Sequence, residues 1–359
     1  MPKSIASKAK KAILHTMNGE VPEAAVRRAI ERFAPEVVQV FGTETALAST
    51  LPDSGIPWAI HIQGNLTVYR HKWFSGIDRV SLLSRSSLQY LLSGRGFVHD
   101  YIRIRDEALR EQKMLKAAPN ILGRTAWDRR IARVLAPGAR YFHCDELIRS
   151  AFWEHSWVDR TPHPGPAIVL GVFHGAIYKG LETLLQATKL MIGQTRKPVL
   201  LRVAGLSEDS EIVQVVKKDR HLEGTLSAVT FLGSLSAESL AQEMMSADVF
   251  AYPSHIDNSP NSLCEAMLMG MPIISSNCGG IPSLLTDSVE GLLVQDGDPY
   301  SLAGAILELL SDPVKAKELA IRAQERARIR HKPKSVTDQL LSIYASISRS
   351  SFLPISPRS

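Results

Sequence analysis

Two acidic residues, Asp257 and Glu265, stand eight positions apart, between a short apolar run and a helical pattern. The residues between them include Asn, Ser and Pro, which are typical of the turn from a strand into a helix. Backbone N–H groups at the start of a helix can bind an anion, and carboxylates accept hydrogen bonds from hydroxyl groups. A sugar nucleotide offers both a pyrophosphate and hydroxyls, so the pattern indicates a site for such a ligand. The structural alternative is an Asx-turn at Asp257 and a first-turn preference at Glu265.

A second loop, at 276–282, contains the adjacent residues Gly279 and Gly280. It also follows a predicted strand and precedes a helix. Adjacent glycines let a ligand approach the backbone closely, because no side chain stands in the way. A single Gly-Gly turn is weak evidence, but two such loops at one sheet edge favour a common site.

The second half of the chain supplies the elements that must position these loops. Short apolar runs predict strands at 167–170, 199–203, 229–232, 249–252, 272–275 and 292–294. Helical patterns lie between or after them, at 180–191, 208–218, 236–245, 263–269 and 300–310. This alternation predicts a doubly wound α/β domain with a parallel sheet covered on both faces. Ligands of such sheets bind outside the carboxyl ends of the strands.

The first half is less regular. Its predicted strands are 37–41, 58–62 and 120–122, and its predicted helices are 22–33, 101–117, one around Trp127 and one opening at 145–149. The proline-rich stretch 159–166 predicts an interdomain linker. We therefore expect an acceptor-side domain at 1–160, a nucleotide-sugar domain at 161–330, and a C-terminal helix and tail at 331–359.

Composition excludes several classes of protein. With 359 residues, 45% hydrophobic and 22% charged, the chain can bury cores and is not globally disordered. No apolar run reaches the length of a membrane span. Three cysteines without a secretory leader indicate a reducing cytoplasm, and no Cys-x-x-Cys or His-Glu-x-x-His spacing predicts a zinc site.

Charge is distributed unevenly. Residues 1–160 hold 24 Lys and Arg against 16 Asp and Glu, whereas residues 161–359 hold 18 against 20. The difference suggests two domains with different partners. The N-terminal lysines Lys3, Lys8, Lys10 and Lys11 either contact an anionic lipid or acidic substrate or belong to a solvated terminus. Nucleic acid is not expected, because the basic residues are scattered without aromatic platforms.

Residues 165–350 strongly resemble the nucleotide-binding domain of retaining GT-B glycosyltransferases of glycosyltransferase family 4. The matching motifs are Asp257…Glu265-Ala266-Met267, Gly270-Met271-Pro272, Gly279-Gly280, Tyr178-Lys179-Gly180-Leu181, Arg202-Val203-Ala204-Gly205, Glu290-Gly291-Leu292-Leu293-Val294 and Asp298. Segments of the first half, around Phe41, Gln63 and Arg124, are similar to the acceptor-side domain of bacterial polysaccharide-cluster members. The resemblance implies two Rossmann-like doubly wound domains facing a cleft. The N-terminal domain is expected to be abbreviated, because only about 36 residues precede its first strand.

The resemblance also implies roles for individual residues. Glu265 would hold the ribose, Asp257 would lie by the donor sugar, and Lys179 would neutralise the diphosphate. Further donor contacts would come from Asn258, Ser259, Asn261, Gly279, Gly280 and Gly205, and acceptor-side candidates are His61, Gln63 and Gly64. The alternatives are an exposed helix-start lysine for Lys179 and a buried, hydrogen-bonded histidine for His61. Neither a metal nor another cofactor is expected, and no protein nucleophile is needed.

The chain departs from the family pattern in the two domains. Phe173 stands where an arginine is usual, with His174 as the nearest alternative cation, and Gln63 replaces a histidine before Gly64. Asp257 is one methylene shorter than the usual glutamate. At the C-terminus two helical patterns, 313–331 and 333–346, imply a last helix that crosses back onto the first domain. An amphipathic partner or membrane helix is the alternative.

The sequence thus predicts a cytoplasmic, metal-independent, retaining, hexosyltransferase-like glycosyltransferase. It would transfer a sugar from a nucleotide-sugar donor to a glycan or lipid-linked acceptor in polysaccharide or cell-envelope biosynthesis. The basic first domain would suit a peripheral contact with the inner face of the membrane. Two alternatives stay open: a GT-B-fold sugar-nucleotide epimerase, and a non-catalytic or truncated sugar-nucleotide-binding protein.

Overall fold

The computed structural model describes residues 23–77, 79–85, 96–159, 164–195 and 197–350, in two compact units. The first unit comprises Met1–His71, Ser87–Glu146 and Pro333–Ser359, and the second comprises Lys72–Ser86 and Leu147–Lys332. The chain therefore leaves the first unit well before the predicted boundary at residue 160, and a short segment of the first half belongs to the second unit. Residues 160–163 of the predicted linker lie outside the described residues, as do the N-terminal lysines Lys3, Lys8, Lys10 and Lys11.

The second unit is built on a six-stranded parallel sheet with the order β10-β9-β8-β5-β6-β7. Its strands are β5 (Ala167–Val172), β6 (Val199–Ala204), β7 (Val229–Gly233), β8 (Val249–Tyr252), β9 (Ile273–Ser276) and β10 (Leu292–Val294). All six predicted strands are confirmed, with ends that differ by at most two residues. The strand order reverses between β5 and β8, where Val169 pairs with Val249 and Leu170 with Phe250. This reversal is the topological switch point at which doubly wound sheets bind ligands.

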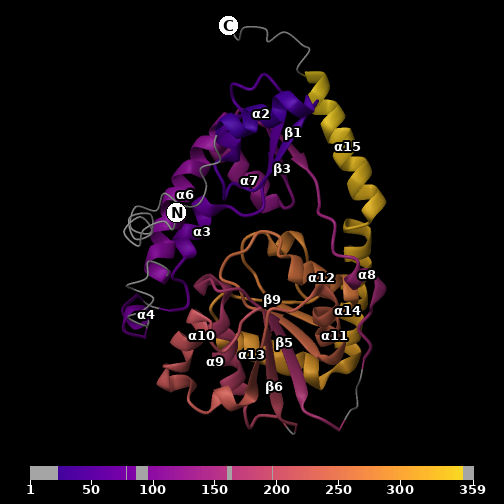
Figure 1. Ribbon diagram of the computed structural model, residues 1–359. Helices are drawn as coiled ribbons and strands as arrows, with labels where there is room; N and C mark the ends of the chain where they lie inside the picture. Colours follow the sequence, from indigo (N-terminus) through magenta and orange to yellow (C-terminus); the bar gives the residue numbers. More distant parts are fainter. Residues whose placement is uncertain (1–22, 78, 86–95, 160–163, 196, 351–359) are drawn as a thin grey trace, which may run out of the picture. The chain divides into compact units, whose positions relative to one another are not determined.

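Helices cover both faces of this sheet (Figure 1). On one face lie α8 (Ala151–Glu154), α11 (Ala237–Ser246), α12 (Asn261–Met269) and α14 (Pro313–Arg330); on the other lie α9 (Leu181–Met191), α10 (Glu211–Lys217) and α13 (Pro299–Ser311). Successive side chains of a strand point to opposite faces of the sheet, so each face has its own layer of buried side chains against its helices. Ile168, Leu170 and Phe250 pack in the same core as Phe152 of α8. That contact explains why the chain joins the second unit before residue 160.

The first unit has a four-stranded parallel sheet whose order, β1-β2-β3-β4, follows the chain. The strands are β1 (Val38–Phe41), β2 (Trp58–His61), β3 (Asn120–Gly123) and β4 (Arg140–His143). Its helices are α2 (Glu23–Phe33), α3 (Leu66–Lys72), α6 (Phe97–Ala117), α7 (Ala126–Leu135) and α15 (Pro333–Ser350). Among the described strands the order does not reverse, so this sheet has no switch point like that of the second unit.

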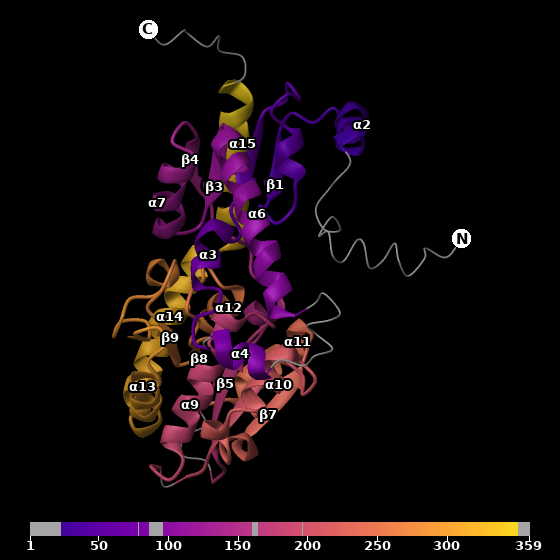
Figure 2. The same ribbon diagram turned by 90° about the vertical axis from the view of Figure 1, so that its left-hand side faces the viewer.

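Two sets of helices bury the faces of the first sheet. Ile60 and Ile121 share one core with residues of α6 and α7, whereas Ala59 and Leu122 share the other with Ile343 of α15. In Figure 2, α6 lies in front of the strands of this sheet and α15 lies behind them. The last helix of the chain therefore completes the first unit.

Local structure in the first half differs from the sequence predictions in several places, and α3, like β4, was not predicted. Strand β4 was not expected, because its four residues, Arg-Tyr-Phe-His, are not a buried apolar run. Residues 145–149, predicted to open a helix, are not helical, and α8 begins only at Ala151. The two carboxylates of this non-helical segment contact basic side chains of the first unit. Glu146 Oε2 lies 2.5 Å from Arg124 Nη1, and Asp145 Oδ2 lies 3.0 Å from His143 Nε2.

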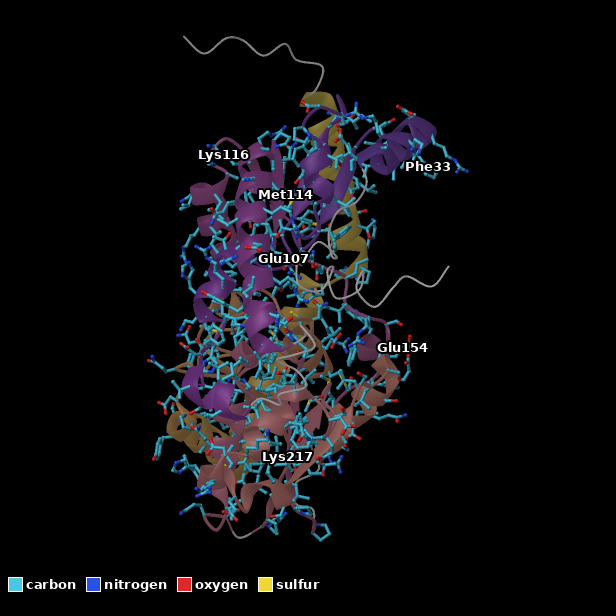
Figure 3. The ribbon with its side chains drawn as sticks, turned by 60° about the vertical axis from the view of Figure 1, so that its left-hand side comes forward. Phe33, Glu107, Met114, Lys116, Glu154 and Lys217 are labelled. Atoms are coloured by element: carbon cyan, nitrogen blue, oxygen red, sulfur yellow. The ribbon has the colours of Figure 1, made fainter. Side chains whose placement is uncertain are left out.

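Helix α6 shows how one side of a surface helix faces the core of the first unit. Met114 is buried in that core, whereas Lys116, two residues on, is exposed (Figure 3). Two residues correspond to just over half a helical turn, so the two side chains leave opposite sides of the helix. Within the described part of the chain, no helix has the length and apolarity required to span a bilayer.

Candidate functional site

The switch point of the second unit holds a buried charged cluster. Lys179 ends the short helix η2 (Ile177–Lys179) after β5, and Asp257 follows β8. The Lys179 ammonium donates hydrogen bonds to Asp257 Oδ2 and, over 3.1 Å, to the hydroxyl of Tyr252. The Tyr252 hydroxyl in turn donates to the same carboxylate oxygen. Lys179 is only 9% exposed and Asp257 only 7%, so the interpretation of Lys179 as an exposed lysine is wrong.

Electrostatics keep Asp257 ionised. Burial by itself would raise the pKa of its carboxyl group, because a low-polarity surrounding disfavours the charged form. The charge of Lys179 and the hydrogen bonds from Lys179, Tyr252 and the Asn258 N–H outweigh burial, so the pKa lies below its ordinary value. The Asp257 side chain is thus a carboxylate near neutral pH.

The second glycine loop packs directly against the Asp257 loop. The Gly280 N–H donates to the Asp257 carbonyl over 2.9 Å. Gly279 has φ +52°, and a Cβ at this position would lie 1.9 Å from the same carbonyl oxygen. Only glycine allows this approach without strain. The two loops therefore lie at one place on the sheet edge, as the sequence predicted.

Glu265 lies in α12 with its side chain buried, and the residue is 2% exposed. Burial raises the pKa of Glu265, and the nearby Arg149 opposes that rise. Arg149 Nε donates to Glu265 Oε1 over 2.8 Å, and its guanidinium lies 5.0 Å from the Phe152 ring centroid. Sequence reasoning missed both Arg149 and Tyr252. Arg149 comes from a segment more than a hundred residues away, and no spacing rule connects it to Glu265.

The remaining predicted donor residues fall into two groups. Asn258 and Ser259 are buried, and the Asn258 N–H donates to Asp257 Oδ1 over 2.9 Å. Asn261 is exposed and begins α12, whose N-cap residue, Pro260, makes no side-chain capping hydrogen bond. Gly205 follows β6, where its N–H donates to the Gly233 carbonyl over 2.7 Å. The first N–H groups of α12 thus have no side-chain cap from the N-cap residue.

Phe173, which stands where the family pattern has an arginine, points its side chain into the protein interior. Phe173 is buried, and its ring leaves so little room at Gly171 that a Cβ there would lie 2.5 Å from it. This position therefore supplies no cation. The neighbouring His174 is exposed, and its Nδ1 accepts the Ala176 N–H over 3.3 Å.

The acceptor-side candidates lie at the carboxyl end of β2 in the first unit. His61 is 3% exposed, its Nδ1 lies 3.2 Å from Gln39 Nε2, and burial lowers its pKa to about 4. It is a buried, hydrogen-bonded, neutral histidine. The Gln63 carbonyl accepts a hydrogen bond from Arg124 over 2.5 Å, and Gly64 lies beside the Tyr69 ring. All of these contacts are with other residues of the first unit.

In the ranges that the structure describes, no group of three or more His, Cys, Asp and Glu side chains is arranged to hold a metal ion.

Comparison with known sequences places this site in a family segment. Residues 168–312 match the family described as "Glycosyl transferases group 1". A D-inositol 3-phosphate glycosyltransferase of Saccharomonospora viridis is 32% identical over 188 residues, 50% of this chain and 43% of that protein. A glycogen synthase of Mycobacterium tuberculosis is 27% identical over 183 residues, again 50% and 43%. The matched segments span less than half the length of these curated relatives.

Comparison with solved structures extends over most of the chain. A sucrose-phosphate synthase from Thermosynechococcus elongatus superposes with a TM-score of 0.69 and 20% identity, covering 91% of this chain and 77% of that one. The Anabaena protein HepE, solved in complex with UDP-glucose, gives 0.67 and 17%, with 90% and 82% covered. The chain has the α/β fold of GT-B glycosyltransferases, and residues 168–312 of its second unit match the group 1 family of these enzymes.

Proposed function

We propose that this chain is a retaining glycosyltransferase that transfers a sugar from a nucleotide-sugar donor to a glycan or lipid-linked acceptor. The observation that carries the proposal is the buried Lys179–Asp257 pair at the switch point, with Glu265 on the helix that follows. Cationic, anionic and backbone donor groups meet there as a sugar nucleotide requires. The solved neighbours support the donor class, because HepE was crystallised with UDP-glucose.

The donor diphosphate and Asp257 are alternative partners for Lys179. A bound diphosphate would take hydrogen bonds from the ammonium that Asp257 now accepts, and the cation would stabilise the departing nucleotide. The uncapped N-terminus of α12 adds N–H groups and the positive end of the helix dipole. Asp257 would then be free to accept a hydrogen bond from a sugar hydroxyl.

Glu265 would accept hydrogen bonds from the ribose hydroxyls. Its Oε1 is already oriented by Arg149, which neutralises the buried charge. A carboxylate held in this way can bind two neighbouring hydroxyls with little loss of side-chain freedom. Removal of its charge should therefore weaken binding of any nucleotide sugar, whatever the sugar.

Retention is proposed from the resemblance to retaining GT-B enzymes, and this cluster favours a route without a covalent intermediate. With the donor bound, Asp257 Oδ2 would still accept the hydrogen bond from the Tyr252 hydroxyl, which makes this oxygen a poor nucleophile. The acceptor hydroxyl would then attack on the face from which the diphosphate leaves and pass its proton to the leaving phosphate. In this scheme the protein positions the substrates and stabilises charge. A cytoplasmic location, with the basic first half at an anionic membrane face, belongs to the same proposal.

A second candidate is a sugar-nucleotide-binding protein that does not transfer. Phe173 favours it, because the buried ring leaves one cation fewer at the diphosphate than the family pattern expects. Such a protein would bind the donor without releasing free nucleotide.

Calorimetric titration with UDP-glucose, GDP-mannose and ADP-glucose, with and without added Mg²⁺, tests the proposal. One of these donors should bind, and Glu265→Gln should weaken its binding about tenfold through loss of a charge-assisted hydrogen bond. Glu325→Gln, an exposed glutamate on α14, is the control. Binding followed by release of nucleotide, with the anomer determined by NMR, supports a retaining transferase. Binding without turnover favours the second candidate, an epimerised donor indicates an epimerase, and no binding refutes the proposed site.

A further inference from the structure

A second buried charged cluster lies two residues before Asp257 and plays no part in the proposed chemistry. His255 is 2% exposed, and its Nε2 lies 2.7 Å from Glu182 Oε1 on α9. Its Nδ1 faces Asp296 Oδ2 at 3.6 Å, and that oxygen accepts a hydrogen bond from Lys72 over 3.1 Å. Side chains from four separate parts of the second unit thus meet at one histidine.

The cluster ties the Asp257 loop to the elements that carry Lys179. The His255 N–H donates to the Tyr178 carbonyl over 2.8 Å, next to Lys179 in η2. The His255 side chain reaches Glu182 in the first turn of α9, which follows η2. A shift of His255 would therefore move Asp257 relative to Lys179.

One side of this cluster is formed by a segment from the first half of the chain. Residues Lys72–Ser86 belong to the second unit, where helix α4 (Arg79–Arg85) lies beside α10. The Trp73 ring packs on Tyr178 with 5.5 Å between centroids. Trp73 and Ile77 are both buried. The segment thus contacts η2 itself, which carries Lys179.

Gly76 is the point of closest approach. It has φ +87°, and a Cβ there would lie 2.0 Å from Glu182 Oε1 and 2.6 Å from His255 Nε2. Next to this contact lies a cavity of about 300 Å³, whose lining includes Gly76, Ile77, Ser81 and Glu182. The segment is therefore not packed tightly along its whole length, and Gly76 sets its contact with the histidine–carboxylate pair.

We infer that Gly76 and the Glu182–His255 pair are positioning residues for the loop of residues 253–260, which carries Asp257. The Lys72–Ser86 segment holds the His255 imidazole against Glu182, and His255 holds the loop that places Asp257 at Lys179. The inference rests on the proposed function for its catalytic consequence. Its structural part, the ordering of residues 253–260, stands on the geometry alone.

Gly76→Ala, compared with Gly193→Ala, tests the inference. Gly193 also has a left-handed backbone, φ +83°, but it is exposed and no atom lies within 4 Å of a Cβ placed there. The two variants share the backbone strain, and only Gly76→Ala displaces Glu182 and His255. Hydrogen exchange of the amides of 253–262 should be about tenfold faster in Gly76→Ala than in Gly193→Ala or the wild type.

The second readout is donor turnover. With UDP-glucose as the probe, kcat should fall about tenfold in Gly76→Ala, because small misplacements of reacting groups are costly, and should not change in Gly193→Ala. His255→Ala should match Gly76→Ala in both readouts. His255→Gln should recover most of the loss, because the amide can still donate to Glu182.

The outcomes distinguish the positioning of the loop from the proposed donor. Unchanged exchange of 253–262 in Gly76→Ala and His255→Ala overturns the inference, whatever the activity. Faster exchange with no UDP-glucose turnover in the wild type supports positioning of the loop and counts against the proposed donor. If Gly76→Ala does not fold, the His255→Ala and His255→Gln pair decides by the same exchange measurement.

Discussion

Each unit carries a buried histidine at the carboxyl edge of its parallel sheet, and the two are in opposite electrostatic surroundings. His61 ends β2, its Nδ1 lies beside the neutral side-chain amide of Gln39, and burial, which outweighs the charge of Glu146, lowers its pKa to about 4. His255 follows β8 and faces the carboxylates of Glu182 and Asp296. Burial alone would lower the pKa of His255, but its hydrogen bond to Glu182 and the two negative charges of Glu182 and Asp296 raise it above its ordinary value.

The difference extends to the other polar residues at the two edges. In the first unit, Glu111 accepts hydrogen bonds from the Thr43 hydroxyl and from the N–H groups of Leu66 and Thr67, at the start of α3. In the second unit, Lys179 and Asp257 bind each other across the gap between two neighbouring strands. A strand order that reverses opens a gap that charged side chains can line. In the first unit, where the described strands show no reversal, the buried carboxylate of Glu111 instead links α6 to the start of α3.

The largest expected effect distinguishes structural from functional carboxylates. Glu111→Ala should lower the free energy of unfolding by about 3 kcal/mol, because several buried donors lose a charged acceptor. Urea unfolding measures the loss. Glu107→Ala, on the same helix and half-buried (Figure 3), is the control and should lower it by less than about 1 kcal/mol. Donor affinity should not change in Glu111→Ala; a loss of affinity without a loss of stability would contradict the comparison.

The pH dependence of His61 is a further test. Its pKa is near 6.5 in the unfolded chain and about 4 in the folded one, so the unfolded state binds the proton first as the pH falls. The histidine therefore costs no stability above pH 6.5 and up to about 3 kcal/mol near pH 4. His61→Gln should remove this part of the acid sensitivity. Equal pH profiles for variant and wild type, by urea unfolding between pH 4 and 8, would show that His61 is not buried as neutral.

Lys179→Met tests whether the switch-point cluster binds a ligand. Donor affinity should fall about 30-fold, equivalent to about 2 kcal/mol, through loss of a charged hydrogen bond. Stability should fall as well, because Asp257 remains buried without its cation. The double variant Lys179→Met/Asp257→Asn should regain stability but not affinity. If it regained both, Lys179 would be a structural residue; Lys317→Met, exposed on α14, is the control.

The smallest expected effect is that of His255, and its sign is opposite to that of His61. Because its folded pKa is raised, His255 contributes stability that is fully present below pH 6.5 and is lost as the pH rises through the folded pKa. His255→Gln should therefore reduce the difference in stability between pH 6 and pH 9. A loss that grows toward acid pH would mean that the two histidines share one environment.

The elements of the second unit could be predicted in detail from the sequence. Strands β8 and β10 begin and end at the predicted residues, because apolar runs bounded by turn residues specify a buried strand directly. Strand β4 could not be predicted, since its residues are only partly buried and its pairing with β3 depends on a neighbour in space. The assignment of Lys72–Ser86 to the second unit could not be predicted from the sequence either, because packing rather than local composition decides it.

The sequence by itself determined the candidate site residues: the spacing of Asp257 and Glu265, the lysine after β5 and the paired glycines are local patterns. Only the tertiary structure decided their partners. Tyr252 and Lys179 share one oxygen of Asp257, Arg149 binds Glu265, and Gly76 lies against Glu182 and His255. The physical reason is range. Turn and helix-start preferences act within a few residues, whereas a buried charge takes its partner from whichever part of the chain the fold brings within hydrogen-bond distance.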